Sequence, residues 1–260
     1  MVAHAEINNL SFVYADENEK ALQHISLSVQ KGEFIALAGG SGSGKTTLLK
    51  HFKKELLPIG TRSGEIFYEG VLIEEVADLL SAQEIGMVFQ NPENQIVMDT
   101  VIQELAFSLE NIGLPSHIIQ KRIAELISFL GFQDLLHQSV HTLSGGQKQR
   151  AAAARMFVRQ PELLVFDDIS SALDVETEQV LWERVFEESE ATCLVVSHRH
   201  PALRRADHII VATNTPAPIN DWMGIYLKQA SYRTYVVALS VPRGAITDAL
   251  STIPMPAVFT

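Results

Sequence analysis

Short apolar runs alternate along the chain with stretches of helical periodicity. Each run is partly β-branched and is followed by glycine, polar or charged residues, a pattern typical of buried strands in an α/β sheet. The expected strands are Phe34 to Ala38, Met87 to Phe89, Leu163 to Phe166, Cys193 to Val196 and His208 to Val211. The pattern therefore predicts an α/β fold.

One segment between these runs has the spacing of an amphipathic helix. Its apolar residues recur every three or four positions, and charged residues occupy the opposite face. The apolar positions are Ile119, Ile123, Leu126 and Leu130, and the charged ones are Lys121, Arg122 and Glu125. Such a stripe indicates core packing rather than a functional site.

The composition changes after Val211. Residues 213–220 contain two prolines and two asparagines, which favours irregular structure. In the remainder, the best periodic stretch is Tyr232 to Leu239, whose apolar and aromatic residues fit a single strand. We therefore expect one domain over residues 1–212 and a tail over 213–260, which is a regulatory addition, a strand that pairs with the domain, or a replaced end of little consequence.

Composition narrows the class of protein. With 260 residues, 47% hydrophobic and 20% charged, the chain resembles an ordinary globular protein that buries a full core. Its formal net charge of −11 argues against a nucleic-acid partner, because phosphate backbones attract clustered Lys and Arg. An anionic ligand must then be held by local geometry.

Cysteine usage and hydropathy bear on the compartment. Cys193 is the single cysteine, so the chain forms no internal disulfide and suits a reducing compartment. Its apolar neighbours favour a buried structural thiol. Since no apolar run reaches the roughly 18 residues of a membrane-spanning helix, we expect a cytoplasmic protein that reaches a membrane only through a partner.

A glycine-rich loop follows the first expected strand. Its residues satisfy the pattern G-x-x-x-x-G-K-[ST], and Thr47 to Phe52 after it can be helical. In such a loop backbone N–H groups converge on the phosphates of a nucleotide, and the helix N-terminus adds positive charge. Lys45 would reach the β- and γ-phosphates, and the Thr46 hydroxyl would hold Mg²⁺. The loop comprises Gly39, Gly40, Ser41, Gly42, Ser43, Gly44, Lys45 and Thr46.

Two carboxylates end the strand Leu163 to Phe166. Ligands of open α/β sheets bind beyond the carboxyl ends of the strands, so Asp167 can hold Mg²⁺ and Asp168 can orient or deprotonate an attacking water. By themselves two acidic residues after a strand more often begin a helix or a loop. The glycine-rich loop favours the chemical interpretation.

The segment Leu143 to Gln147 carries a third signal. Ser144 and Gln147 have the spacing of a capping box that begins a helix. That structural role does not explain Gly145 and Gly146, which disfavour a helix. Glycines here are sensible if a phosphate must approach the backbone closely.

These residues together resemble the nucleotide-binding subunit of ATP-binding-cassette (ABC) transporters. The resemblance covers residues 1 to about 211, and Leu143 to Gln147 matches the signature motif of the family letter for letter. It implies a P-loop NTPase with a RecA-like core, an N-terminal antiparallel β-subdomain and an inserted α-helical subdomain at about residues 91–155.

The resemblance also implies site roles. Tyr14 matches the aromatic that stacks on adenine, Gln90 the glutamine of the Mg²⁺ and water network, and His198 the histidine at the γ-phosphate, whereas Ser171 to Asp174 match a loop that crosses a dimer interface. As lone residues, Tyr14 and His198 would be read as structural. The implied catalytic residues are Lys45, Gln90, Asp168 and His198, the metal ligands are Thr46, Gln90 and Asp167, and the nucleotide-binding residues are Tyr14, Gly39 to Thr47, Ser144, Gly145, Gly146, Gln147 and Asp174.

The implied cofactors are ATP and Mg²⁺, and the implied assembly is a homo- or heterodimer with a second ABC ATPase subunit. Two subunits sandwich two ATP molecules head to tail, so that Ser144 to Gln147 of one face the nucleotide held by Lys45 of the other. Integral membrane subunits would be separate chains, and the protein would lie on the cytoplasmic face of the membrane.

The branch of the family is open. Val88 to Ile96 and Glu104 to Phe107 look like energy-coupling-factor importers, whereas Phe166 to Asp174 look more like some exporters. We favour an importer, because exporters usually carry their spanning helices in the same chain. Two features depart from the family: Asp168 stands where most members have Glu, and nothing after residue 213 resembles it. A slow-hydrolysing regulatory or non-transport ABC ATPase is the alternative.

Overall fold

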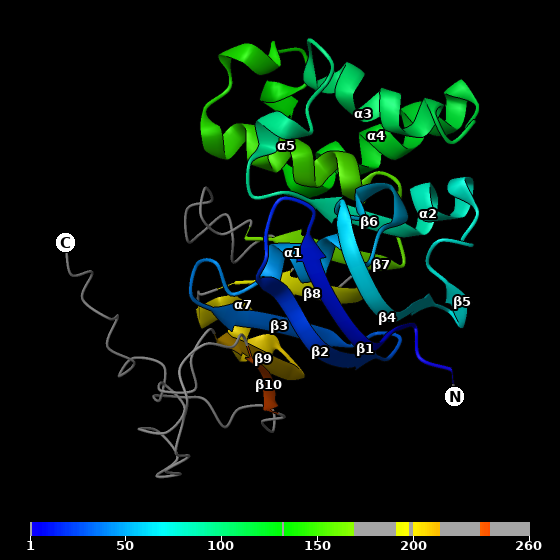
Figure 1. Ribbon diagram of the computed structural model, residues 1–260. Helices are drawn as coiled ribbons and strands as arrows, with labels where there is room; N and C mark the ends of the chain where they lie inside the picture. Colours follow the sequence, from blue (N-terminus) through cyan, green and yellow to red (C-terminus); the bar gives the residue numbers. More distant parts are fainter. Residues whose placement is uncertain (1, 132, 169–190, 198–199, 214–234, 240–260) are drawn as a thin grey trace, which may run out of the picture.

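The computed structural model describes residues 2–131, 133–168, 191–197, 200–213 and 235–239. Three parts make up this region: an antiparallel sheet, a parallel sheet and a group of helices at one end (Figure 1). Ser171, Asp174 and His198 lie outside the described residues. Among those described, no helix is long and apolar enough to cross a membrane.

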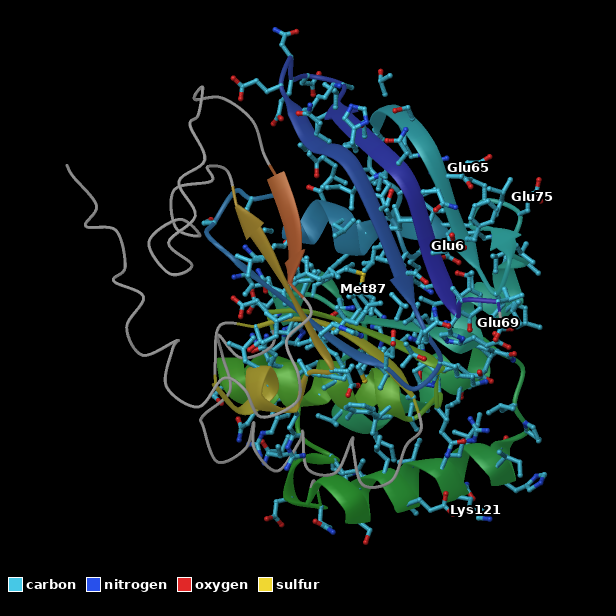
Figure 2. The ribbon with its side chains drawn as sticks, turned by 90° about the horizontal axis from the view of Figure 1, so that it is seen from below. Glu6, Glu65, Glu69, Glu75, Met87 and Lys121 are labelled. Atoms are coloured by element: carbon cyan, nitrogen blue, oxygen red, sulfur yellow. The ribbon has the colours of Figure 1, made fainter. Side chains whose placement is uncertain are left out.

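The antiparallel sheet has the strand order β2-β1-β4-β5. Its strands are β1 (Ala5–Tyr14), β2 (Lys20–Val29), β4 (Gly60–Tyr68) and β5 (Val71–Leu72). One face of this sheet is apolar and buried against the parallel sheet, while Glu6 and Glu65 lie on its outer side (Figure 2). This part corresponds to the expected β-subdomain.

The parallel sheet has the order β10-β9-β3-β8-β7-β6, and only β10 runs antiparallel to its neighbour. Its strands are β3 (Phe34–Gly39), β6 (Ile85–Val88), β7 (Leu163–Asp167), β8 (Thr192–Val196), β9 (His208–Thr213) and β10 (Tyr235–Leu239). All five strands expected before residue 212 exist. The expected strand at 87–89 is shifted, because the Phe89 amide leaves the sheet and donates to Gln95 Oε1 at 2.8 Å.

The tail contributes one strand to this sheet. β10 pairs antiparallel with β9 from Tyr235 opposite Thr213 to Leu239 opposite Ile209. The expected strand at Tyr232 to Leu239 is confirmed over its last five residues. Of the three origins weighed for the tail, the described part fits a strand that pairs with the domain.

Some helices pack on the parallel sheet, and others form a separate helical subdomain. The helices are α1 (Lys45–Lys50), α2 (Asp78–Glu84), α3 (Val101–Glu110), α4 (Ser116–Leu130), α5 (Gly145–Phe157) and α7 (His200–Arg205), and the short 3₁₀ turns are η1 (Lys54–Leu56), η2 (Pro92–Asn94), η3 (Gln133–Leu135) and η4 (Val140–Thr142). Three of them, α3, α4 and α5, enclose a separate apolar core. In α4 the predicted stripe is buried at Ile119, Ile123 and Leu126, while Lys121 lies on the outside (Figure 2).

An ion pair connects α5 to α3. Glu104 is completely buried, and the guanidinium of Arg155 donates to its carboxylate and to the Gln95 carbonyl. The other oxygen of Glu104 accepts from the amides of Val97 and Met98. These hydrogen bonds join α5, α3 and the segment from Gln95 to Met98, so the network fixes α5 relative to the loop after β6.

Candidate nucleotide site

The glycine-rich loop connects β3 to α1 by a left-handed turn. Gly44 has φ +85°, and a Cβ there would lie 2.6 Å from the Ala21 carbonyl oxygen of β2. α1 therefore begins at Lys45 rather than at Thr47, because the chain becomes helical only after this turn. Gly39 is also required by packing, since a Cβ there would lie 1.9 Å from the Ala212 carbonyl oxygen of β9.

The Lys45 ammonium closes the loop on itself. It donates to the carbonyl oxygens of Gly39 and Gly40, both at 2.7 Å, and to Ser43 Oγ at 3.2 Å. Partial burial lowers the pKa of Lys45, and the negative charges of Asp167 and Asp168 oppose that effect. A phosphate could replace these carbonyls as the partner of the ammonium, because a charged acceptor forms the stronger hydrogen bond.

Thr46 and Asp167 bring two oxygen ligands together. The Thr46 hydroxyl donates to Asp167 Oδ1 at 2.9 Å. Asp167 is buried at the end of β7, and this burial raises the pKa of its carboxyl while the Thr46 hydrogen bond lowers it. Mg²⁺ takes oxygen ligands of this kind, so the pair fits the ion expected from the sequence.

Asp168 stands at the mouth of the same site. Its φ of +49° lies in the left-handed region, which Asp tolerates better than most residues. Gln90 follows β6 and donates from Nε2 to Asp168 Oδ2 at 3.3 Å. The tertiary structure thus joins the two residues, 78 positions apart in the sequence, that were expected to act on water.

Tyr14 ends β1 on the other side of the loop. Its hydroxyl and Thr47 Oγ1 lie 2.9 Å apart, and its ring packs edge-on against Phe12 at 4.9 Å between centroids. The side chain is half-buried and lines the site. An aromatic ring there is available to stack on a base.

One hollow contains most of the expected residues. Its walls include Tyr14, the loop from Ser41 to Thr47, Gln90, Asp167 and Asp168. The sequence analysis missed a second group, the hairpin residues Glu17, Glu19, Lys20, Ala21 and Gln23. No local motif marks these residues, because the pairing of β1 with β2 brings them to the glycine-rich loop.

The segment Ser144 to Gln147 is not part of this hollow. Ser144 caps α5, accepting from the Gln147 amide at 3.3 Å, and its own amide donates to Gln147 Oε1 at 2.8 Å. The capping box is therefore confirmed. A Cβ on Gly145 would meet nothing within 4 Å, so packing within the described chain does not explain this glycine.

A family model named ABC transporter matches residues 22–171, which include the loop, both aspartates and the capped α5 helix. The chain belongs to the ABC transporter family. The energy-coupling factor transporter ATP-binding protein EcfA1 of Oceanobacillus iheyensis is 36% identical over 212 residues, covering 80% of this chain and 75% of that protein.

A longer ABC relative comes from Bacillus anthracis. It bears the name of an ABC transporter ATP-binding protein and is 76% identical over 202 residues. The match covers 76% of this chain but 37% of the relative. The chain therefore spans well under half the length of this ABC relative.

Solved ABC structures share the fold. The dimeric post-hydrolysis state of the cassette MJ0796, bound to ADP and Pi, aligns with a TM-score of 0.71 and 27% identity, covering 80% of this chain and 93% of that one. The cbiO1 protein of Clostridium perfringens, part of the ABC transporter complex cbiONQ, aligns with a TM-score of 0.69 and 29% identity over 81% and 85% of the two chains. The expected fold class is confirmed.

Proposed function

We propose that the chain binds and hydrolyses Mg-ATP in the hollow between the glycine-rich loop and the end of β7. The observation that carries the proposal is the convergence of Lys45, Thr46 and Asp167 from two strand ends. A nucleoside triphosphate requires a cation for its phosphates, and its metal ion requires oxygen ligands such as a hydroxyl and a carboxylate. The solved cassette with ADP and Pi supports the same assignment.

The residues of the site divide the work. Lys45 would release the Gly39 and Gly40 carbonyls and bind the β- and γ-phosphates, while Tyr14 stacks on the adenine. Thr46, Gln90 and Asp167 would hold Mg²⁺, which neutralises charge on the phosphates. Asp168 would orient the attacking water and accept its proton, positioned by the Gln90 amide.

We further propose that two cassettes share each nucleotide. Ser144 and Gly145 lie outside the hollow, and the space beside Gly145 is open. The N-terminus of α5 can therefore meet the γ-phosphate held by a second cassette, where its amides favour an anion. The dimeric cassette structures support this arrangement, and the expected roles of Asp174 and His198 belong to it.

The work of the ATPase would be transport of a small solute. The proposed partners are separate membrane-spanning subunits, with this chain on their cytoplasmic face and an importer as the favoured direction. The energy-coupling-factor relatives and the cbiO1 protein of a transporter complex support this part. The short Asp168 side chain favours one alternative, a cassette that holds ATP but hydrolyses it slowly.

The test is steady-state hydrolysis by the purified protein. Lys45→Ala should abolish Mg-dependent ATP turnover, because Ala supplies no charge to the phosphates. Lys121→Ala, on the outer face of α4, is the matched control and should hydrolyse ATP at the wild-type rate. Wild-type turnover by the Lys45→Ala protein would remove the loop from the mechanism.

A further inference from the structure

The ring of a buried histidine lies beside two carboxylates at the amino-terminal end of β7. His4 is 3% exposed, and neither of its ring nitrogens makes a hydrogen bond to any described residue. Its Nδ1 nevertheless lies 3.4 Å from Glu69 Oε1. Buried polar groups normally have hydrogen-bond partners, so the two ring nitrogens need a partner that the described chain does not supply.

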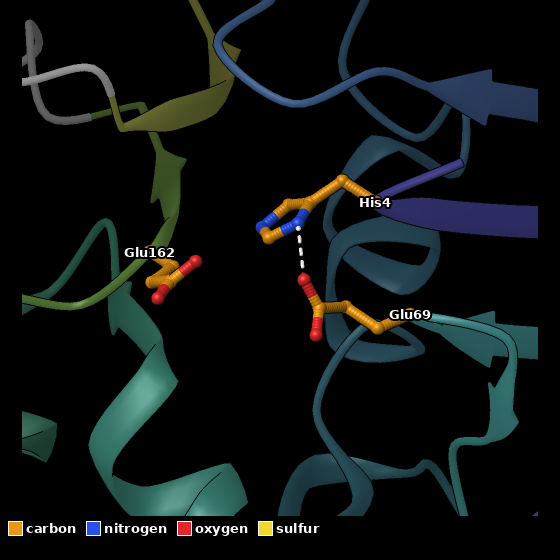
Figure 3. A group of neighbouring side chains, drawn as sticks. All are labelled: His4, Glu69 and Glu162. Carbon is orange, nitrogen blue, oxygen red and sulfur yellow. Dashed lines mark ion pairs between the residues drawn. The ribbon is translucent and has the colours of Figure 1, made fainter. Parts of the chain in front are cut away.

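The main chain holds the three side chains together. The His4 amide donates to the Val29 carbonyl, and the His4 carbonyl accepts from the Glu69 amide, each at 2.9 Å. Glu162 comes from the loop before β7, where its amide donates to the Glu84 carbonyl at 2.9 Å. Figure 3 shows the imidazole between the two carboxylates.

We propose that His4, Glu69 and Glu162 bind one divalent transition-metal cation. One ligand atom from each residue lies within 4.8 Å of the other two, whereas donors around a tetrahedral metal stand about 3.4 Å apart when each bond is about 2.1 Å. Side-chain rotation closes this difference, because the two glutamates are 52% and 44% exposed. An imidazole nitrogen with two carboxylates suits Zn²⁺ or a neighbouring first-row ion better than Mg²⁺.

Neighbouring side chains orient His4 and pair with Glu162. The Tyr68 ring packs edge-on against the His4 ring at 5.1 Å between centroids, and its hydroxyl donates to Glu84 Oε2 at 2.9 Å. Packing of this kind fixes the orientation of a ligand. Lys31 Nζ lies 2.6 Å from Glu162 Oε2 and competes with a metal for that carboxylate, but the lysine side chain is 62% exposed and can move away.

The proposed site has a place distinct from the nucleotide hollow. His4 precedes β1, Glu69 follows β4 and Glu162 precedes β7, whereas Asp167 ends β7. A bound cation would therefore join the antiparallel sheet to the parallel sheet at the end opposite the glycine-rich loop. Its direct effect would be to stabilise the contact between the two sheets.

The experiment is a Zn²⁺ titration of the full chain without a polyhistidine tag. The protein is stripped of metal and titrated calorimetrically in excess Mg²⁺, which occupies the oxygen ligands of the nucleotide hollow. Glu69→Gln changes an exposed side chain and should weaken Zn²⁺ binding by about 100-fold or more, because even supporting residues around a metal typically contribute about 10- to 100-fold. His4→Ala should weaken it equally.

Matched variants separate this site from weak surface binding. Glu65→Gln and His117→Ala change exposed residues outside the cluster and should keep the wild-type affinity, whereas Lys31→Ala should bind Zn²⁺ more tightly because Glu162 loses its competitor. Zn²⁺ should also raise the melting temperature of the wild type but not of Glu69→Gln. Equal Zn²⁺ affinity in the wild type and a folded Glu69→Gln protein would overturn the proposal, as would no binding at all.

Discussion

At the scale of single residues, the backbone conformation of Asp168 limits which acidic side chain suits the site. Its left-handed φ of +49° favours a short polar side chain, and Gln90 holds its carboxylate. A shorter acid than the usual Glu suits this backbone conformation but retracts the carboxylate from the water that Asp168 is proposed to orient. Asp at this position therefore favours the stability of the backbone over the distance that the carboxylate can extend into the site.

Asp168→Glu should raise kcat for ATP, by up to about 100-fold, because a positioning error of about 1 Å can cost that much. The same change should lower the free energy of unfolding by about 1 kcal/mol through the left-handed backbone. Asp168→Asn should suppress turnover and trap an ATP-bound dimer. Steady-state hydrolysis, chemical denaturation and size-exclusion chromatography measure these effects, and a flat or lower kcat for Asp168→Glu would show that the site is built around Asp.

Cys193 gives a second test at this scale. The thiol is buried in β8, and burial raises its pKa to about 12. Because the thiolate is the reactive form, iodoacetamide at pH 8 should alkylate Cys193 far more slowly in the folded protein than in urea. Mass spectrometry of timed samples measures both rates, and equal rates would contradict the burial of β8.

At the scale of elements, β10 protects an edge of the parallel sheet. It pairs with β9 over five residues, and an unpaired edge strand exposes its backbone groups to water and to other chains. No assigned nucleotide residue lies in β10. Its contribution should therefore be to stability rather than to ATP chemistry.

A chain that ends at Thr213 should still bind Mg-ATP and dimerise but should melt at a lower temperature than the full chain. A domain of this size loses about 2–4 °C for each kcal/mol of stability. A chain that ends at Ser240 retains β10 and is the matched control. Differential scanning calorimetry and nucleotide binding measure the two properties; a folded chain ending at Thr213 that binds no nucleotide would place the tail in the active site.

At the scale of the whole molecule, the hollow and the N-terminus of α5 are separate surfaces. The sites proposed for ATP are complete only when two cassettes combine them. Damage to the loop of one subunit and to the signature of the other then falls on the same composite site. The second composite site stays intact.

Mixing Lys45→Ala subunits with Gly146→Asp subunits should therefore restore hydrolysis. Neither variant by itself has an intact composite site, whereas a mixed dimer has one. Turnover should rise toward about half the wild-type rate per mixed dimer if each site works independently. Cross-linking measures the mixed dimers, and their presence without hydrolysis would argue against the head-to-tail arrangement or show that both sites must act together.

The sequence by itself determined the existence of the five expected strands before residue 213, the glycine-rich loop and the capped start of α5. These features are local: phosphate binding needs consecutive backbone amides beside Lys45, and a capping box needs only Ser144 and Gln147 in one helical turn. Strand boundaries differed from expectation near Phe89 and in the tail because side-chain and strand partners distant in sequence decide them. The roles of Asp174 and His198 stay predictions.

Only the tertiary structure decided which distant residues meet. The pairing of β1 with β2 brings the hairpin at Lys20 to the hollow. Neighbouring strands leave no room for a side chain at Gly39 and Gly44. Gln90 contacts Asp168 because β6 and β7 are paired and both residues follow the ends of these strands. The two carboxylates beside His4 come from Glu69 and Glu162, which lie 65 and 158 residues later in the sequence. No local pattern encodes such contacts, because they arise from packing two sheets on one core.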